Sequence, residues 1–501
     1  MRRYLLLAAI LCLGFFVRAY HLSGNPQGFF CDEAAVGYNA YAILHTGKDE
    51  YGVPFPIFFR SFGDYKTPIL IYANIPAVAL LGLTEFAVRI TSVLFGMAAI
   101  VVMYFFGKEL SEKRREETGL LAALITASMP WFIHYNRTGF DINAYCTFFA
   151  LTAYLFIRAA HDKRMIIPAF ISAGFTLYTY NPERLLLPLL LAGAAVIYGA
   201  YYRAHRKEMV IGFLLFCALS IPLVVSFFTG SAFALFTTVV MPQANAWNML
   251  KNYVLQLTPG YFVYGEPTVL VRHFVGGLRP LLLVTVPFAY VGIACVLLRW
   301  RKNNTYRFLL YWLLIYPVAG AITTDGGPFT SRSVIGAPLF ALLISLGIVR
   351  TVAFLKCRVR PVVSATVILL AVILNLVLFA RFYFYQYPFY SMGFTGWQYG
   401  ARDIVRYFAA HETEYNGLFI GADPEFSHPE IFFKFYAPGD CQHCMVGYPD
   451  TNYIPGRRQL FAVSPGYITS HPQYTYTIVR TVYYPNGDPA FYLVRVREAP
   501  H

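Results

Sequence analysis

Apolar runs close to the length of a membrane span recur through the first three quarters of this 501-residue chain. A helix needs about 20 mostly apolar residues to cross the hydrocarbon core of a bilayer. Composition agrees, because 57% of the residues are hydrophobic and only 13% are charged, whereas soluble domains average roughly 25% charged. The predicted fold class is therefore an α-helical polytopic membrane protein. We expect about eleven transmembrane helices, at residues 4–20, 87–107, 118–133, 142–158, 165–180, 185–202, 209–228, 280–298, 308–322, 333–349 and 361–382.

The basic residues predict how these helices are oriented. The first run lacks a small-residue cleavage site, so we expect it to remain as an anchor. Half of the 40 Lys and Arg fall in alternate short segments, which the positive-inside rule places in the cytoplasm with the N-terminus. The net charge of +14 is then a topology signal, and we expect no nucleic-acid partner. The predicted location is the plasma (inner) membrane. The basic segments are residues 2–3, 108–115, 158–164, 203–207, 299–307 and 350–360.

One apolar run conflicts with this alternation of cytoplasmic and outer loops. Residues 68–83 look hydrophobic enough to cross, and crossing would invert every later basic loop. The run is short, however, and contains Pro68, Asn74 and Pro76. We therefore predict an interfacial or re-entrant helix on the outer side of the membrane.

The acidic residues favour chemistry at the outer face. Transporters tend to place ionisable groups near the bilayer midplane, whereas no carboxylate here falls at the midpoint of a predicted span. A flippase or transporter is the alternative, together with a non-catalytic glycolipid-binding scaffold. The short cytoplasmic loops contain no Gly-rich phosphate loop, so an activated donor must arrive by another route, as lipid-linked donors do. The ten carboxylates expected at the outer face are Asp32, Glu33, Asp49, Glu50, Asp64, Glu85, Asp141, Glu183, Glu266 and Asp325.

The chain changes character after residue 382. Alternating stretches such as YTYTIVRTVYY predict strands, so we expect two parts. Residues 1–382 form a transmembrane domain with a long first outer loop at 21–86, and residues 383–501 form a small extracytoplasmic (periplasmic) α/β domain. Cys441-x-x-Cys444 lies in this tail. We interpret it first as a disulfide, with zinc binding, helped by His428 or His443, as the alternative.

The first outer loop contains the most informative motifs. An Asp-Glu pair at 32–33 is followed by Gly-Asp-Tyr-Lys-x-Pro at 63–68 and by Glu-Phe-Ala-x-Arg at 85–89. In these motifs the chain resembles the GT-C membrane glycosyltransferases, specifically the superfamily of protein O-mannosyltransferases and aminoarabinose–lipid A transferases. Residues 134–147, 174–190 and 327–338 are similar to later landmarks of that group.

The resemblance implies a GT-C-like fold and a polyprenyl-phosphate-linked monosaccharide donor. Transfer would take place at the outer face, with inversion, to a lipid, a cell-envelope glycan or a protein. It also implies that Asp32 is the general base, that Glu33 supports it, and that Asp141 is a second active-site carboxylate. No cofactor is predicted, and a role for a divalent metal is left open.

The residue chemistry leads to the same kind of site. Inverting transfer needs a base for the acceptor's proton and cations for the departing phosphate. The cationic candidates on outer segments are Lys66, Arg137 and Arg332. Each candidate also has a structural interpretation. Acids at helix starts act as caps or as first-turn charges, and basic residues near span ends contact lipid headgroups.

Overall fold

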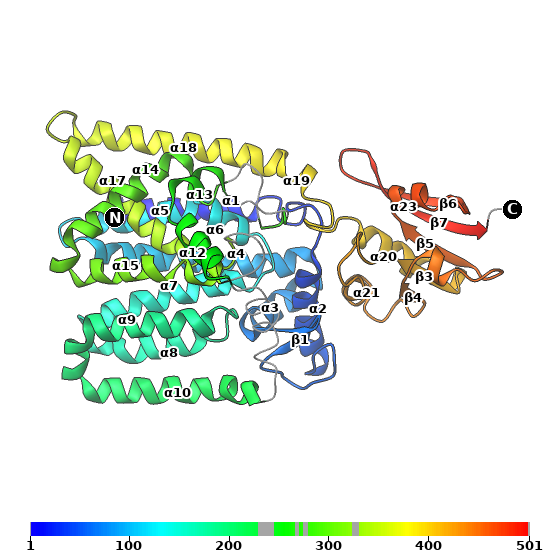
Figure 1. The fold of residues 1–501 in the computed structure, drawn as a ribbon, viewed down its shortest axis with the longest axis horizontal. Helices are drawn as coiled ribbons and strands as arrows, with labels where there is room; N and C mark the ends of the chain where they lie inside the picture. The colour runs from blue at the N-terminus through cyan, green and yellow to red at the C-terminus, as the bar shows by residue number, and fades with distance from the viewer. Residues whose placement is uncertain (1, 229–244, 266–269, 274–278, 323–329, 499–501) are drawn as a thin grey trace.

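The computed structural model describes residues 2–228, 245–265, 270–273, 279–322 and 330–498. Figure 1 shows a bundle of long helices lying side by side, with a smaller sheet-containing domain at one end of the bundle. Eleven bundle helices correspond to the predicted runs. They are α1 (Arg2–Ala19), α4 (Glu85–Gly107), α5 (Arg115–Ser128), α7 (Ile142–Ala159), α8 (Ile166–Thr176), α9 (Glu183–Ala204), α10 (Arg206–Phe228), α14 (Val286–Arg299), α15 (Asn304–Ile315), α17 (Gly336–Leu355) and α18 (Pro361–Tyr385).

The helical membrane fold is confirmed. Among the described residues, seven helices are long and apolar enough to cross a membrane. They are the helices labelled α4, α7, α9, α10, α14, α17 and α18. The other four, α1, α5, α8 and α15, do not meet that combined measure of length and apolarity. The predicted span 118–133 is divided because Met129 precedes Pro130 and adopts an extended conformation, as residues before proline prefer to do. The short helix α6 (Pro130–Tyr135) follows.

The first outer loop folds as a compact layer at the end of the bundle that faces the sheet domain (Figure 1). It contains α2 (Cys31–Thr46), the hairpin strands β1 (Phe59–Ser61) and β2 (Asp64–Lys66), and α3 (Pro68–Leu81). Helix α3 has 14 residues and is therefore about 21 Å long, against a hydrocarbon core of about 30 Å. It is too short to span, as expected for an interfacial helix.

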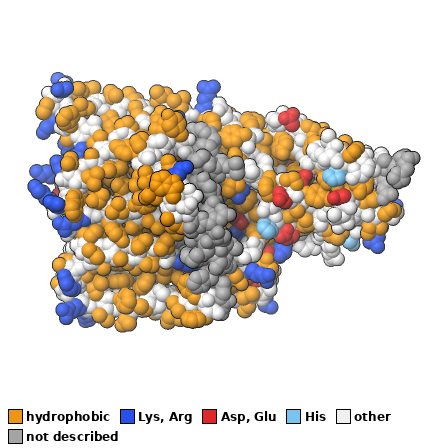
Figure 2. Space-filling view, viewed as in Figure 1, with side chains coloured by type: hydrophobic (Ala, Val, Ile, Leu, Met, Phe, Trp, Pro, Cys, Tyr) orange, Lys and Arg blue, Asp and Glu red, His pale blue; other side chains and the backbone are white. Residues whose placement is uncertain are grey.

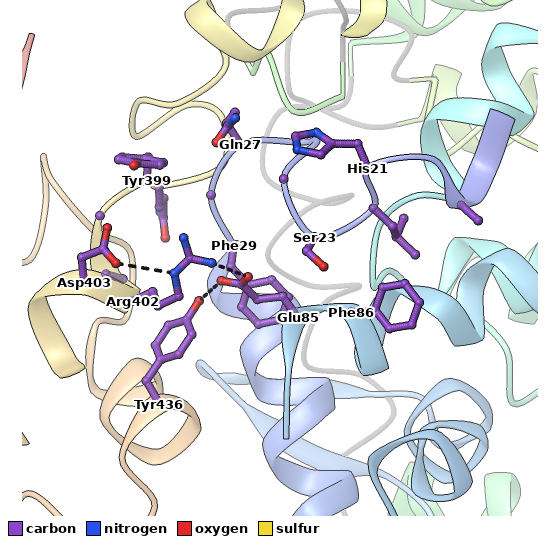
Figure 3. A pocket seen from close by; sticks show the side chains of 17 residues that line it. His21, Ser23, Gln27, Phe29, Glu85, Phe86, Tyr399, Arg402, Asp403 and Tyr436 are labelled. Carbon is purple, nitrogen blue, oxygen red and sulfur yellow. Dashed lines mark hydrogen bonds and ion pairs between the residues drawn. The ribbon is translucent and has the colours of Figure 1, made fainter. Parts of the chain in front are cut away.

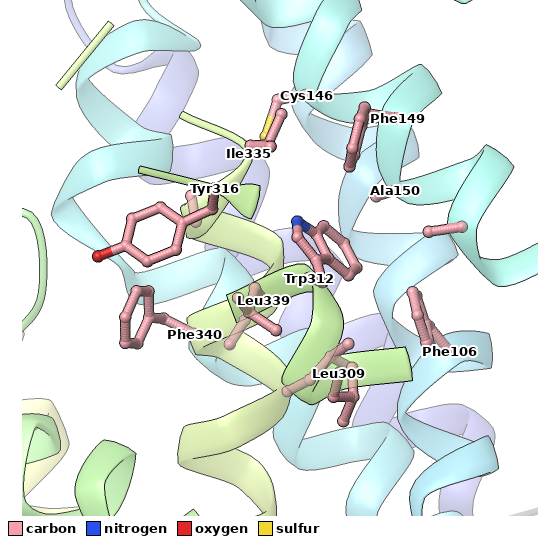
Figure 4. Close-up of a cluster of buried hydrophobic side chains, with 14 of the residues drawn as sticks. Phe106, Cys146, Phe149, Ala150, Leu309, Trp312, Tyr316, Ile335, Leu339 and Phe340 are labelled. Carbon is pink, nitrogen blue, oxygen red and sulfur yellow. The ribbon is translucent and has the colours of Figure 1, made fainter. Parts of the chain in front are cut away.

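Aromatic side chains fill the centre of the bundle (Figure 4). Trp312 is fully buried, with its ring centroid 6.1 Å from Phe106 and 5.4 Å from Phe149. These residues lie on α15, α4 and α7, so one packing cluster joins helices that are far apart in the sequence. Four shorter helices complete the described part of the membrane domain and its connection to the C-terminal domain. They are α12 (Ala246–Leu255), α13 (Pro259–Tyr264), α16 (Val318–Ala321) and α19 (Tyr387–Tyr390).

The C-terminal domain contains a five-stranded mixed sheet of order β4-β3-β5-β7-β6. Strands β3, β4 and β5 are parallel, whereas β7 is antiparallel to β5 and to β6. The predicted pairing of Cys441 with Cys444 is confirmed as a disulfide. The strands are β3 (Gly417–Ile420), β4 (Cys444–Val446), β5 (Gln459–Val463), β6 (Tyr474–Tyr483) and β7 (Pro489–Glu498), and the helices are α20 (Ala401–Ala410), α21 (Glu430–Tyr436), α22 (Pro449–Asn452) and α23 (Pro465–Ser470).

The two predicted parts share a hydrophobic core. The ring centroid of Phe29, just before α2, lies 4.8 Å from that of Phe435 on α21. A buried cluster continues from α2, α3 and α4 into the sheet domain. The Lys434 ammonium of the C-terminal domain also pairs with the Glu50 carboxylate of the first loop at 3.0 Å. The C-terminal domain therefore holds the outer layer in place.

Basic side chains gather at the opposite end of the bundle (Figure 2). Exposed members of this group include Arg3 at the start of α1 and Arg114 and Arg115 at the start of α5. This separation of charge agrees with the predicted grouping of the basic loops on one side.

Candidate active site

A cavity of about 350 Å³ lies among the first loop, the start of α7 and the segments before α9 and α17. Its walls contain three carboxylates and three cations. These residues are Asp32, Asp64, Asp141, Lys66, Arg272 and Arg332. Charged groups converging on a concave surface are typical of functional sites.

Asp32 and Lys66 meet at the centre of this arrangement. Helix α2 begins at Cys31, which puts Asp32 in its first turn, and Lys66 ends β2. The Lys66 Nζ donates to Asp32 Oδ1 at 2.7 Å. Burial alone would lower the pKa of Lys66, but the nearby Asp32 and Asp141 carboxylates outweigh it and raise that pKa above its usual value. The Asp32 side chain remains 37% exposed, so its carboxylate is accessible from the cavity.

Asp141 occupies the N-cap position of α7 but does not cap the helix with its side chain. Its Oδ2 accepts instead from the Thr67 hydroxyl at 2.8 Å, and its buried Oδ1 has no hydrogen-bond partner among the described residues. Burial raises the pKa of Asp141 to about 6, against the opposing effect of Lys66. The capping interpretation therefore does not account for this side chain.

Asp64 was not singled out by sequence as a site residue, yet it lines the same cavity. Burial raises the pKa of its carboxyl to about 6, although the backbone N–H of Tyr65 and the Lys66 ammonium act in the opposite direction. Its position in the Gly-Asp-Tyr-Lys stretch was the available signal, because Asp64 and Lys66 share one short strand.

Glu33 lies away from the cavity. Its carboxylate accepts from Arg89 Nε and Nη2, both at 3.0 Å, and from the backbone N–H of Gly139 at 2.8 Å. Both members of this ion pair are fully buried. Glu33 also accepts from the backbone N–H of Phe30, the N-cap residue of α2. Its contacts are those of a structural residue that joins α2 to α4.

Arg137 is also placed elsewhere. Its side chain is fully buried and donates to the backbone carbonyls of Val17, Arg18 and Asn25 at 2.7–3.0 Å. Those carbonyls belong to the end of α1 and the turn that follows it. Arg137 thus ties this turn to the segment between α6 and α7, and it is not among the residues that line the cavity.

Arg332 lines the cavity, together with Arg272 and His273. The Arg272 guanidinium lies 4.2 Å from the ring centroid of Phe30. Arg272 and His273 carry no signal in the sequence, because they fall in a long loop without a periodic pattern. Glu266, Asp325 and the first residues of the 327–338 motif lie outside the described residues. Within the described ranges, no cluster of three or more His, Cys, Asp or Glu is arranged to hold a metal ion.

Membrane-length helices with a charged cavity at one end of the bundle define the class, which is a polytopic membrane protein. A family comparison narrows this class. Residues 66–228 match the family described as dolichyl-phosphate-mannose-protein mannosyltransferase. No curated protein sequence matches the chain significantly.

Solved structures extend the likeness over the whole chain. ArnT from Cupriavidus metallidurans in the apo state is similar at a TM-score of 0.60 and 12% identity, over 98% of this chain and 97% of that one. The same protein bound to undecaprenyl phosphate gives a TM-score of 0.54. AglB from Archaeoglobus fulgidus, in complex with an inhibitory peptide and a dolichol-phosphate, gives 0.54 at 12% identity, over 89% of this chain and 64% of that one. The chain therefore has the GT-C glycosyltransferase fold, and the predicted resemblance is confirmed.

Proposed function

We propose that this protein transfers a monosaccharide from a polyprenyl-phosphate donor to a hydroxyl acceptor at the outer face of the plasma (inner) membrane. The observation that supports this most directly is the cavity that joins Asp32, Lys66 and Arg332 at one end of a GT-C bundle. A base and cations for a departing phosphate are the two things that such a transfer requires. The polyprenyl phosphate bound to ArnT supports a lipid-linked donor.

The proposed step is an inverting displacement. The acceptor oxygen attacks the anomeric carbon, the bond from that carbon to the phosphate oxygen breaks, and polyprenyl phosphate leaves with the electron pair. Asp32 accepts the acceptor's proton as the new bond forms. Asp141, which is held by Thr67, would position the sugar or the acceptor hydroxyl.

Lys66, Arg272 and Arg332 would hold the donor phosphate. All three line the cavity, and preorganised cations stabilise charge that develops on a leaving group. Glu33 and Arg137 would act indirectly, by fixing α2 and the turn after α1. The C-terminal domain, packed on α2 and α4, would help to recognise the acceptor.

The class of activity can be tested with purified protein and a polyprenyl-phosphate sugar. Mass spectrometry after incubation with cell-envelope glycans, lipids or proteins should detect free polyprenyl phosphate and a glycosylated acceptor. Lipid that is moved across vesicles but chemically unchanged would instead indicate a flippase. Lipid that is bound and neither moved nor changed would indicate a scaffold.

Replacing Lys66 with Ala should weaken the binding of polyprenyl phosphate about 10- to 100-fold, because a hydrogen bond between charged partners is lost. Binding can be measured by native mass spectrometry or by displacement of a fluorescent lipid. Lys48→Ala is the matched control, since Lys48 is exposed at the end of α2. If the Lys66 and Lys48 variants bind polyprenyl phosphate with equal affinity, Lys66 does not hold the phosphate.

The predicted orientation of the membrane helices can be tested by labelling single cysteines. In a background with the six free cysteines replaced, Arg60→Cys and Thr84→Cys should both react with an impermeant thiol reagent on intact cells. Both positions are exposed and flank α3. Lys113→Cys, exposed near the start of α5, should react only after permeabilisation. Labelling of just one of the two flanking positions would mean that α3 crosses the bilayer.

A further inference from the structure

Three successive backbone carbonyls around Arg272 are held by side chains from other elements. The segment 271–273 forms no helix or strand, and each of its carbonyls accepts a hydrogen bond at 2.8–3.1 Å. Backbone polar groups of a loop need partners, and these partners fix the path of the chain beside the active-site cavity. The donors to residues 271, 272 and 273 are, in that order, the Tyr387 hydroxyl on α19, His134 Nε2 on α6 and the Thr330 hydroxyl before α17.

The His134 ring supplies one donor and one acceptor. A carbonyl oxygen only accepts, so Nε2 carries the proton that is donated to Arg272, and Nδ1 accepts from the Tyr383 hydroxyl at 3.2 Å. Burial lowers the pKa of His134 to about 4, and Arg137 acts in the same direction, although the bond to the Arg272 carbonyl opposes them. The ring is therefore neutral at pH 7, and the direction of both hydrogen bonds is defined.

The Arg272 side chain lies at the site that this backbone segment positions. Arg272 lines the cavity, and its guanidinium lies 4.2 Å from the ring centroid of Phe30. Burial lowers the pKa of Arg272, whereas the Asp32 carboxylate acts in the opposite direction, so the two charges are within electrostatic reach. A displacement of about 1 Å at a reacting group can cost about 100-fold in rate. The placement of the Arg272 backbone therefore matters for any phosphate that its guanidinium binds.

The backbone of Arg272 is also tied to the linker between α19 and α20. Its N–H and its Nη1 both donate to the Thr395 carbonyl at 3.4 Å. Trp397, two residues further along, donates from Nε1 to the Tyr387 hydroxyl at 2.7 Å. That hydroxyl is the one that donates to residue 271, so the linker and the segment 271–273 share one hydrogen-bond network.

The far end of this linker is fixed at the start of α20. There Arg402 donates to Glu85 Oε2 at 3.0 Å, and the Tyr436 hydroxyl donates to the other oxygen of Glu85 at 2.6 Å (Figure 3). Glu85 begins α4, so the linker is anchored to the membrane domain as well as to the sheet. Arg272 is thus held by His134 and by a linker that is fixed at both ends.

We propose that His134 is a positioning residue for the donor phosphate and acts through Arg272. By holding the Arg272 carbonyl, it sets where the guanidinium meets the phosphate. The inference rests on the proposed function, because it takes the donor phosphate to be the ligand of Arg272. A histidine that only fills space would need a ring of the right size, whereas positioning needs the Nε2 donor. The rings around it, at centroid distances of 5.1–6.2 Å, are those of Tyr135, Tyr383, Tyr387 and Trp397.

The test compares the affinity for polyprenyl phosphate in the full-length protein, purified in detergent. His134→Phe keeps an aromatic ring and removes the donor, so affinity should fall about three- to tenfold, the effect of one hydrogen bond. His134→Gln keeps an N–H near the position of Nε2 and should restore most of that affinity. His411→Phe is the matched control, since His411 also bonds to a backbone carbonyl, that of Tyr407 at 2.9 Å, but does not line the cavity.

A double-mutant cycle shows whether His134 acts through Arg272. Arg272→Ala should by itself weaken the binding of polyprenyl phosphate, and adding His134→Phe should then cause no further loss. A general loss of stability would not produce this dependence on Arg272. An equal loss in both backgrounds, or wild-type affinity in His134→Phe, overturns the inference and leaves the proposed transfer intact.

Hydrogen exchange distinguishes failure of this inference from failure of the proposed function. Without any ligand, the backbone N–H groups of residues 271–273 should exchange faster in His134→Phe than in His134→Gln or the wild type. Mass spectrometry of overlapping peptides measures this exchange. Unchanged exchange in His134→Phe overturns the inference alone, whereas normal binding in both Lys66→Ala and Arg272→Ala overturns the phosphate site on which it rests.

Discussion

Asp32→Asn should lower the rate of sugar transfer about 10²- to 10⁴-fold, the usual contribution of a general base. Asparagine keeps the size and hydrogen-bonding capacity of the side chain but cannot accept the proton. The Asp32 carboxylate is more than one third exposed, so losing its ion pair with Lys66 should change stability little. Turnover of a polyprenyl-phosphate sugar at saturating donor, followed by mass spectrometry, measures the effect.

The affinity for the donor distinguishes a general-base role of Asp32 from a role in binding the donor phosphate. In Asp32→Asn, Lys66 keeps its charge and loses its carboxylate partner, so polyprenyl phosphate should bind at least as tightly as in the wild type. Asp440→Asn, at an exposed carboxylate of the C-terminal domain, is the matched control and should transfer normally. If Asp32→Asn folds and turns over like the control, Asp32 is only a first-turn helix charge and the base must be sought elsewhere, with Asp141 the next candidate.

The helical fold could be predicted from sequence because its signals are local. Apolar runs and alternating basic loops depend on a bilayer's thickness and surface charge, and neither requires knowledge of tertiary contacts. The short α3 followed from its length and prolines in the same way. One boundary was missed: α5 ends at Ser128, inside the predicted span 118–133, because Met129 is extended before Pro130.

The site could be predicted only in part. Asp32, Lys66 and Asp141 were expected at one site from their motifs, but whether they line one cavity depends on how the first loop folds onto α7. Arg272 has no local pattern, so sequence could not bring it to the cavity. Glu33 and Asp32 are neighbours in one helical turn, where successive side chains point about 100° apart. Which of them faces the cavity was decided by the buried Arg89 on α4.

Glu33→Ala should destabilise the protein by about 3–5 kcal/mol, because it leaves the Arg89 guanidinium buried without its counter-charge. Both side chains are fully buried, so water does not screen the loss. The backbone N–H groups of Gly139 and Phe30 would lose their acceptor as well. Thermal unfolding of the purified protein measures the effect, and Glu414→Ala, at an exposed carboxylate, should stay within about 0.5 kcal/mol of the wild type.

The double substitution Glu33→Leu with Arg89→Met distinguishes a structural role of Glu33 from a direct role in the reaction. Replacing a buried ion pair with apolar residues of similar size is often neutral or stabilising, so this variant should recover most of the stability that Glu33→Ala loses. Arg89 also donates to the carbonyls of Leu22, Pro26 and Gly28, which is a reason to expect incomplete recovery. If Glu33 only positions α2, the double variant should keep a substantial fraction of transfer activity and normal polyprenyl phosphate binding. A folded double variant that binds donor yet transfers no sugar would mean that the Glu33 carboxylate itself serves the reaction, as the family resemblance first implied.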